Sequence, residues 1–296
     1  MRTISTSLLA FASAAFLLAF EASATELVSI PSSSATKAIS VTLEQGDAAI
    51  QRRRYRLAFN IYNQLAQQGN AQAQLNLGGL YAIGKGVQRN YALAALWYTR
   101  AAEQGLALAQ VIVAENLERG DRGFPLDPAA AVPWYQKAAD QGFVEAQREL
   151  GRRYGLGEGV PQDYSVSAGW YKKAADQGDA ESQLRLGLIY FNGEGVSQDD
   201  VISSSWFLKA AEQGRADAQV LLGMRIFAGL GLPKDSVQGL KWLILGTDDL
   251  ASLMWLAETA VLSKRQVMAN LTPAQISEAQ ALAKQWRKPT TNRTIR

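Results

Sequence analysis

The strongest constraint on the fold is an internal repeat with a period of about 36 residues. The dipeptide Gln-Gly begins at Gln68, Gln104, Gln141, Gln177 and Gln213, so its spacings are 36, 37, 36 and 36 residues. A tryptophan recurs in step, at Trp97, Trp134, Trp170, Trp206 and Trp242. A fixed period of this length is the signature of stacked repeats, so we expect one array rather than separate globular domains.

Each unit is predicted to contain two helices. The first runs from the Gln-Gly turn to a loop glycine, for example over residues 71–83, and an Asn or Asp caps the second. The second helix carries its tryptophan on an apolar stripe, which predicts core packing rather than a binding cage. The glycines expected to serve close packing, turns and helix ends are Gly78, Gly84, Gly86, Gly105, Gly142, Gly151, Gly157, Gly159, Gly178, Gly187, Gly193, Gly195, Gly214, Gly223, Gly229 and Gly231. The second unit departs from the pattern because its loop, Gly120-Asp121-Arg122-Gly123, is one residue longer.

These residues carry a resemblance to a known family. The pattern A-x-A-Q-x-x-L-G-x-x-Y-x-x-G-x-G-V, followed by D-x-x-x-A-x-x-W-Y-x-K-A-A-x-Q-G, resembles the Sel1-like repeat, a relative of the tetratricopeptide repeat. It is clearest over residues 180–214 and 71–105. The resemblance implies an all-α, right-handed solenoid of helix-turn-helix units, because one hairpin cannot bury both of its faces.

The predicted organisation follows from the repeat. Residues 42–69 resemble a tetratricopeptide-like opening hairpin, and the five repeats span 70–105, 106–142, 143–178, 179–214 and 215–247. Residues 248–288 are expected to form closing helices, with Thr272-Pro273 as a helix start. The tail, 289–296, is polar.

The first 24 residues have the pattern of a secretory signal. An apolar run of 13 residues, from Leu8 to Phe20, precedes the small residues Ala22-Ser23-Ala24. We expect cleavage near Ala24, with an uncleaved anchor as the alternative, and a flexible leader over residues 25–41. The protein is therefore expected in the periplasm, or secreted.

Composition excludes several classes of chemistry. The chain has no cysteine and no histidine, so disulfides, thiolate nucleophiles, Ser-His-Asp triads and Cys- or His-ligated zinc are excluded. The net charge of +3 is too small to indicate nucleic-acid binding. The Gly-Glu-Gly loops lack the Lys-Ser/Thr of a phosphate-binding loop, and the carboxylate pairs Asp199/Asp200 and Asp248/Asp249 lie at predicted helix starts. We therefore predict a protein that is not an enzyme and holds no cofactor or metal.

The basic run at residues 52–56 has two interpretations. It could meet an acidic partner, but a solvated junction of the opening hairpin is favoured because a single short cluster is a weak footprint.

A candidate binding surface follows from aligning the first helices, which line the concave face in this family's relatives. Three positions vary between units, and we take them as surface positions. They hold Asn76, Ile112, Glu149, Arg185 and Leu221; Gly79, Glu115, Arg152, Leu188 and Met224; and Leu80, Asn116, Arg153, Ile189 and Arg225. Within this set the predicted partner-binding residues are Glu115, Asn116, Glu149, Arg152, Arg153, Arg185 and Arg225.

The hypothesis is that the central arginines hold an acidic or extended peptide, since arginine pairs well with carboxylates. The alternative is a solvated face with local Glu–Arg pairs.

The resemblance thus implies a non-catalytic scaffold that binds a partner protein, such as an envelope component or a sensor ectodomain. Two alternatives remain. One is peptidoglycan binding. The other is interaction with β-lactams, which is described for some secreted Sel1-type proteins. Those proteins carry a disulfide in each repeat, so the absence of cysteine from this chain disfavours this alternative.

Overall fold

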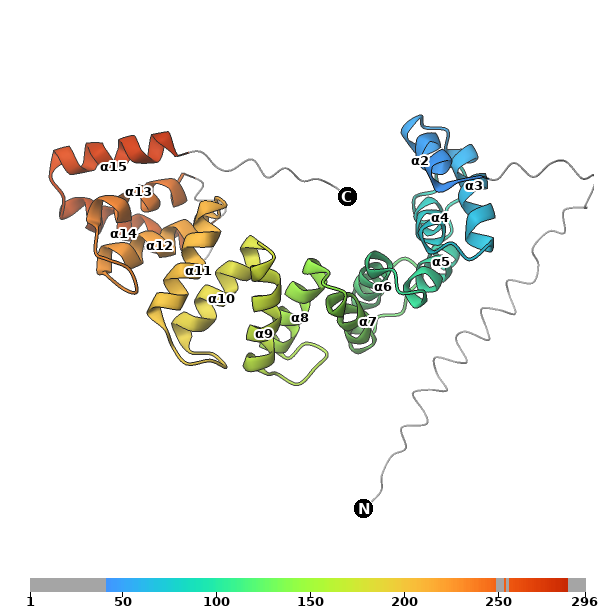
Figure 1. The fold of residues 1–296 in the computed structure, drawn as a ribbon, viewed down its shortest axis with the longest axis horizontal. Coiled ribbons are helices and arrows are strands. Elements are labelled where there is room, and N and C mark those ends of the chain that lie inside the picture. Colours follow the sequence, from blue (N-terminus) through green and yellow to red (C-terminus); the bar gives the residue numbers. More distant parts are fainter. Residues whose placement is uncertain (1–40, 249–252, 254–255, 287–296) are drawn as a thin grey trace, which may run out of the picture. The chain divides into compact units, whose positions relative to one another are not determined.

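The computed structural model describes residues 41–248, 253 and 256–286. Within these residues it contains fourteen α-helices and no strand, and the helices succeed one another in chain order (Figure 1). The all-α architecture that the repeat predicts is confirmed. The predicted signal peptide (1–24), nearly all of the leader (25–41) and the tail (289–296) lie outside the described residues.

The helix bounds follow the period. The opening hairpin is α2 (Leu43–Gln51) and α3 (Tyr55–Gln67). The first helices of the five repeats, which we call the A-helices, are α4 (Ala71–Ile83), α6 (Ala107–Arg119), α8 (Val144–Leu156), α10 (Ala180–Asn192) and α12 (Ala216–Ala228). The second helices, or B-helices, are α5 (Tyr91–Glu103), α7 (Pro128–Asp140), α9 (Tyr164–Asp176), α11 (Asp200–Glu212) and α13 (Ser236–Gly246). The chain closes with α14 (Ala257–Ala269) and α15 (Pro273–Gln285).

Packing is between neighbours. Each A-helix packs on the B-helix of its own repeat, and each B-helix packs on the A-helix that follows. At the carboxyl end, α15 and α14 return onto α13. This arrangement produces buried clusters between successive helices, the expected core of a stacked-repeat protein.

Two glycines show why the repeat needs this residue. A Cβ atom on Gly78 would lie 2.8 Å from ring carbons of Tyr98, so the glycine lets α5 approach α4 closely. Gly86 has φ of 76°, and a Cβ there would collide with the carbonyl oxygen of Tyr55 in the preceding hairpin. The glycines therefore set both the spacing within a repeat and the spacing between repeats.

The B-helices start as predicted. The side chain of Asn90 accepts a hydrogen bond from the backbone N–H of Leu93 at 3.0 Å. Aspartates do the same in the later repeats, at Asp127, Asp163, Asp199 and Asp235.

Buried glutamines connect one repeat to the next. The amide of Gln74 donates to the carbonyl of Ala66 at 3.2 Å, and its own oxygen accepts from the Gln104 amide at 2.6 Å. The same pairing joins Gln141 to Gln110, Gln177 to Gln147 and Gln213 to Gln183, at 2.9, 2.8 and 2.8 Å. The Gln of each Gln-Gly turn in this series therefore bonds the buried glutamine of the A-helix in its own repeat, and we call the series the glutamine ladder.

The recurring tryptophans are core residues, and a basic side chain covers the ring of most of them. Four of the five are buried, and Trp134 is half-buried. The basic residue three positions later lies over the ring: Nζ of Lys209 is 3.7 Å from the ring centre of Trp206, and Arg100, Lys137 and Lys173 make the same contact with their own tryptophans. Cation–π attraction keeps these side chains on the indole rings while they remain exposed.

The two ends differ from the repeats. Arg52, Arg53 and Arg54 are exposed at the junction of α2 and α3, the solvated position favoured from the sequence, and Arg53 has a positive φ of 58°. At the other end Thr272 caps α15, as predicted, in a capping box with Gln275. Trp286 packs edge-on against Trp242 with ring centres 6.2 Å apart, so the end of α15 covers the last tryptophan of the series.

Candidate interaction surface

The A-helices present two half-exposed positions, the sixth and the ninth. These positions hold Asn76 and Gly79 in α4, and Arg185 and Leu188 in α10. The buried fourth position repeats its residue type in every copy, with Gln74, Gln110, Gln147, Gln183 and Gln219. The sixth and ninth positions instead vary in size and charge. We call these ten side chains the A-helix face.

The tenth position is buried, contrary to our expectation. Leu80, Asn116, Arg153, Ile189 and Arg225 occupy it, and all five are buried. The assignment of Asn116, Arg153 and Arg225 as surface residues is therefore wrong. The tenth position lies three residues after the buried seventh and seven after the buried third, so it belongs to the core-facing stripe of the helix.

Arg153 is the most deeply buried charge among the described residues. Its side chain is 1% exposed, with Nη2 2.7 Å from Oε2 of Glu118 and Nε 3.2 Å from Oε1 of Glu149. Neither contact has the alignment of a hydrogen bond, so both act as ion pairs. The guanidinium also stacks on Tyr135, 4.9 Å from the ring centre. Arg153 thus joins α8 to α6 and α7, and its charge is neutralised inside the chain.

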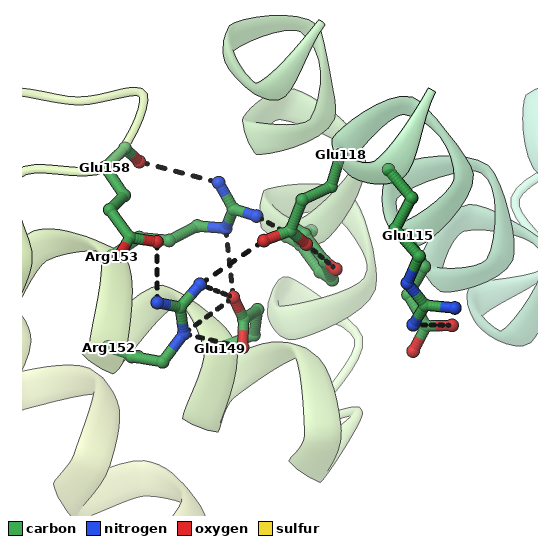
Figure 2. A network of polar contacts seen from close by, with 8 residues as sticks. Glu115, Glu118, Glu149, Arg152, Arg153 and Glu158 are labelled. Carbon is green, nitrogen blue, oxygen red and sulfur yellow. Dashed lines mark hydrogen bonds and ion pairs between the residues drawn. The ribbon is translucent and has the colours of Figure 1, made fainter. Parts of the chain in front are cut away.

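Arg152 belongs to the same network from the surface side. It contacts Glu149 and Glu158 at 2.6 Å each and Glu118 at 3.4 Å (Figure 2). The hydrogen bonds that Arg152 donates to Glu149 raise the pKa of Arg152 above its ordinary value. Three carboxylates therefore surround two guanidinium groups, and the centre of the A-helix face is not a basic patch.

Tyr135 completes the network. Its hydroxyl donates to Oε2 of Glu118 at 3.1 Å. Burial, reinforced by the charge of Glu118, raises the pKa of Tyr135 well above its usual range. The phenol therefore remains a donor that holds Glu118 in place.

Arg225 and Asn116 also have structural partners. Nε of Arg225 donates to Oγ of Ser204 at 2.6 Å, and Nη2 bonds Oδ1 of Asp200 at 2.5 Å. Asn116 donates to the carbonyl of Ile112 at 2.7 Å. Arg225 thus fastens α12 to the start of α11, while Asn116 is satisfied within its own helix.

The remaining predicted residues are accessible but paired. Arg185 is 52% exposed and bonds Glu181 at 2.7 Å, one helical turn away. Glu115 lies 3.5 Å from Arg119. These local pairs are the alternative that the sequence left open for this face.

A groove at the N-terminal end of the face was missed by sequence reasoning. Its volume is about 650 Å³, and its lining includes Asp47 of α2, Gly79 and Ile83 of α4, Tyr98 of α5, Leu108 and Ile112 of α6, and Arg122 of the following loop. Ile83 is 59% exposed and Leu108 46% exposed, so large apolar side chains stand open to solvent here. One signal was present in the sequence. Gly79 occupies a position that is filled in the later repeats by Glu115, Arg152, Leu188 and Met224.

The described residues contain no group of three or more acidic side chains placed to hold a metal ion. None of their helices has the length and apolar character needed to cross a membrane.

Comparison with known proteins decides the family. A model of the Sel1 repeat matches residues 71–106, 107–143, 144–179, 180–214 and 216–248. The chain belongs to the Sel1 repeat family. No match to a curated protein was found.

Two solved structures support the fold. A Sel1 repeat protein from Oxalobacter formigenes is 28% identical, with a TM-score of 0.67, and the match covers 83% of this chain and all of that one. A protective antigen present in uropathogenic Escherichia coli strains, which displays the Sel1-like repeat fold, is 27% identical with a TM-score of 0.51. That match covers 82% of this chain but only 59% of the antigen. The predicted repeat solenoid is thereby confirmed.

Sel1 repeat proteins are generally non-catalytic scaffolds for protein–protein interaction. In this chain the first two Sel1 repeats contribute most of the groove lining, whereas the Arg152–Arg153 network lies mainly in the third.

Proposed function

We propose that this Sel1 repeat protein is a non-catalytic scaffold of the bacterial periplasm that binds another protein through its A-helix face. The observation that carries the proposal is the contrast between positions of the A-helices. The buried fourth position keeps its residue type, because all five A-helices carry a glutamine there. The sixth and ninth positions carry side chains as different as Gly79, Arg152 and Met224. The A-helices are thus held in the same way in every repeat but present different side chains to solvent, which suits recognition of one extended partner.

The location is proposed from the sequence. The apolar run and the Ala-Ser-Ala site of residues 1–24 support export. N-terminal sequencing of the protein recovered from a periplasmic extract is expected to begin at Thr25. Recovery in the cytoplasm with Met1 intact would refute export.

The partner is proposed to be an envelope component or the ectodomain of a membrane sensor. A photoreactive amino acid at Arg185, which is exposed on the A-helix face, should crosslink one defined protein in the native cell. The matched control is the same amino acid at Lys172, an exposed residue of a B-helix. Capture from the Lys172 position alone, or no protein captured from either, would contradict the proposal. Retention on insoluble sacculi would instead favour peptidoglycan binding.

A further inference from the structure

Several departures from the repeat pattern meet at the N-terminal groove. Scattered departures would be neutral variation on a solenoid surface. These instead line one hollow, and each makes it deeper, more apolar or more positively charged.

The first departure is Gly79, which opens the floor of the groove. A Cβ atom added here would meet only the hydroxyl oxygen of Tyr98, at 3.8 Å. No backbone constraint explains this glycine, because it lies inside α4 with ordinary helical geometry. Its neighbour Gly78 differs, since it is pressed against the Tyr98 ring. Gly79 lowers the stability of the helix by up to about 1 kcal/mol relative to alanine, and the missing side chain leaves an empty space.

The second departure is Leu108, an apolar residue at an exposed helix position. The corresponding residues of the other A-helices are polar, namely Gln72, Glu145, Glu181 and Asp217. Leu108 and Ile112 are one turn apart on α6 and both line the groove. Together with Ile83 of α4 they form an apolar wall open to solvent. Exposed apolar side chains gathered in a hollow mark a binding site rather than a solvated surface.

The third departure is Arg122, which lies in the loop that is one residue longer than the others. In the first repeat a hydrogen bond from the N–H of Asn90 to the carbonyl of Tyr81, at 3.0 Å, closes the loop. In the second repeat the N–H of Asp127 makes the equivalent bond to the carbonyl of Leu117, at 2.8 Å. The extra residue is therefore absorbed inside the loop, where Arg122 takes a left-handed φ of 48°. A non-glycine residue in this region is uncommon and often belongs to a functional site.

The charges of the groove are not equivalent. Asp47 already accepts hydrogen bonds from the hydroxyl of Tyr62 at 2.5 Å and from the amide of Asn76 at 3.5 Å. Arg122 makes no ion pair with any residue that the structure describes. The hydroxyl of Tyr98 likewise has no hydrogen-bond partner among these residues. The groove thus offers a free positive charge and a free phenol beside its apolar wall.

We propose that this groove binds a segment of a partner protein that inserts a large apolar side chain over Gly79 and places a carboxylate against Arg122. The inference rests on the proposed scaffold function and names the site and the chemistry of its ligand. It places the anchoring contact of the extended partner in the first two Sel1 repeats rather than at Arg152 and Arg153, whose charges are satisfied within the chain, and it leaves the contact expected at Arg185 in place.

The test uses short synthetic peptides of three kinds: two leucines flanked by aspartates, by lysines or by serines. Each is labelled with a fluorophore and titrated against the purified chain by fluorescence anisotropy. The acidic peptide should bind the wild-type chain most tightly. Gly79→Leu should weaken its binding more than about tenfold, because leucine fills the space that the ligand needs. Arg122→Glu should reverse the order of the acidic and basic peptides.

The control is Gly169→Leu in α9. A Cβ at Gly169 meets no atom within 4 Å, so this variant makes the same exchange at an open helical position outside the groove. Both leucine variants should melt no earlier than the wild type, and Gly169→Leu should bind the acidic peptide normally. Equal affinity for the three peptides, or unchanged binding by Gly79→Leu, overturns the proposal. A dimer in sedimentation that Gly79→Leu converts to a monomer also overturns it, since the occupant is then a second copy.

Failure of this inference can be told from failure of the scaffold function. If the protein captured from Arg185 is still captured by the Gly79→Leu chain, and the peptides show no preference, the groove is not the site but the scaffold function stands. If no protein is captured, the scaffold function fails whatever the peptides show.

Discussion

At the scale of single residues, the same residue type serves opposite purposes depending on its helix position. Arg152 and Arg153 are adjacent, yet Arg152 is 35% exposed and Arg153 is 1% exposed. A buried charge is tolerated only with its partners, because removing one of them leaves the others desolvated and uncompensated.

Replacing Arg153 with alanine is therefore expected to lower the free energy of unfolding by about 3 kcal/mol, since Glu118 and Glu149 lose the charge that balances them. Arg152→Ala should lower it by about 1 kcal/mol or less, because water replaces the lost contacts. Urea denaturation followed by circular dichroism measures both. Equal losses would contradict the structural role assigned to Arg153.

The adjacent glycines of α4 give a second matched pair. Gly78→Ala places a methyl group against the Tyr98 ring and should destabilise the chain by about 1–3 kcal/mol. Gly79→Ala meets open space and should stabilise it by about 0.5–1 kcal/mol through helix propensity. Thermal melting of the two variants checks the signs, which must be opposite.

Residue-level prediction from the sequence succeeded where a residue type has one dominant role. Glycines with positive φ, caps such as Asn90 and the buried tryptophans follow from local chemistry. Arg153 was misplaced because polarity was given more weight than periodicity. It lies three residues after buried Leu150 and seven after buried Ala146, and its counterparts Leu80 and Ile189 are apolar, which was the available signal. The ion pairs that make its burial possible include one between separate helices, Arg153 with Glu118, and the sequence alone does not show which helices lie together.

At the scale of helices, the glutamine ladder fixes how one hairpin docks on the next. The fourth residue of each A-helix donates to a carbonyl of the preceding helix, for example Gln147 to Ala139 at 3.1 Å. Its partner Gln177 belongs to the Gln-Gly turn of the same repeat and also bonds the carbonyl of Gly142 at 3.0 Å. Gln-Gly was predicted as a turn signal, but the role of its glutamine between repeats required the structure.

Gln147→Leu should lower the free energy of unfolding by about 1–3 kcal/mol, because it removes both hydrogen bonds of a buried side chain: the one donated to the carbonyl of Ala139 and the one accepted from the amide of Gln177. Gln177→Leu should cost less, since Gln177 is exposed and water can replace its bonds. Denaturant titration of the two variants tests the order. A larger loss in Gln177→Leu would place the strength of the ladder in the turn rather than in the A-helix.

At the scale of the whole array, stability is expected to be local because packing is between neighbours. Trp286→Ala removes the ring that covers Trp242 and should raise hydrogen exchange in α13 and α15. Exchange in α4 to α7 should stay unchanged. A uniform rise along the chain would show instead that the array unfolds as one unit.

Buried tyrosines make the array sensitive to alkali. Burial raises the pKa of Tyr171 to about 12, and it also raises the pKa of Tyr98. The unfolded chain releases these protons near pH 10, so the folded chain holds more protons above that pH. The contribution to stability is complete below about pH 10 and declines as the pH rises toward 12. The melting temperature should therefore fall over this interval, and less steeply in Tyr171→Phe.

The long loop of the second repeat has a consequence for how such a chain changes over time. Docking between units is set by the glutamine ladder, and the loop absorbed its extra residue without altering the ladder bond between Gln141 and Gln110. Loops are thus uncoupled from the spacing of the stack. An insertion can therefore change the side chains at the edge of a unit, as in the loop that carries Arg122. Whole units can be duplicated or deleted at a Gln-Gly boundary, because the turns at Gln104, Gln141, Gln177 and Gln213 repeat the same glutamine–glutamine bond. A protein built in this way can acquire a new ligand by lengthening one turn while its framework stays in register.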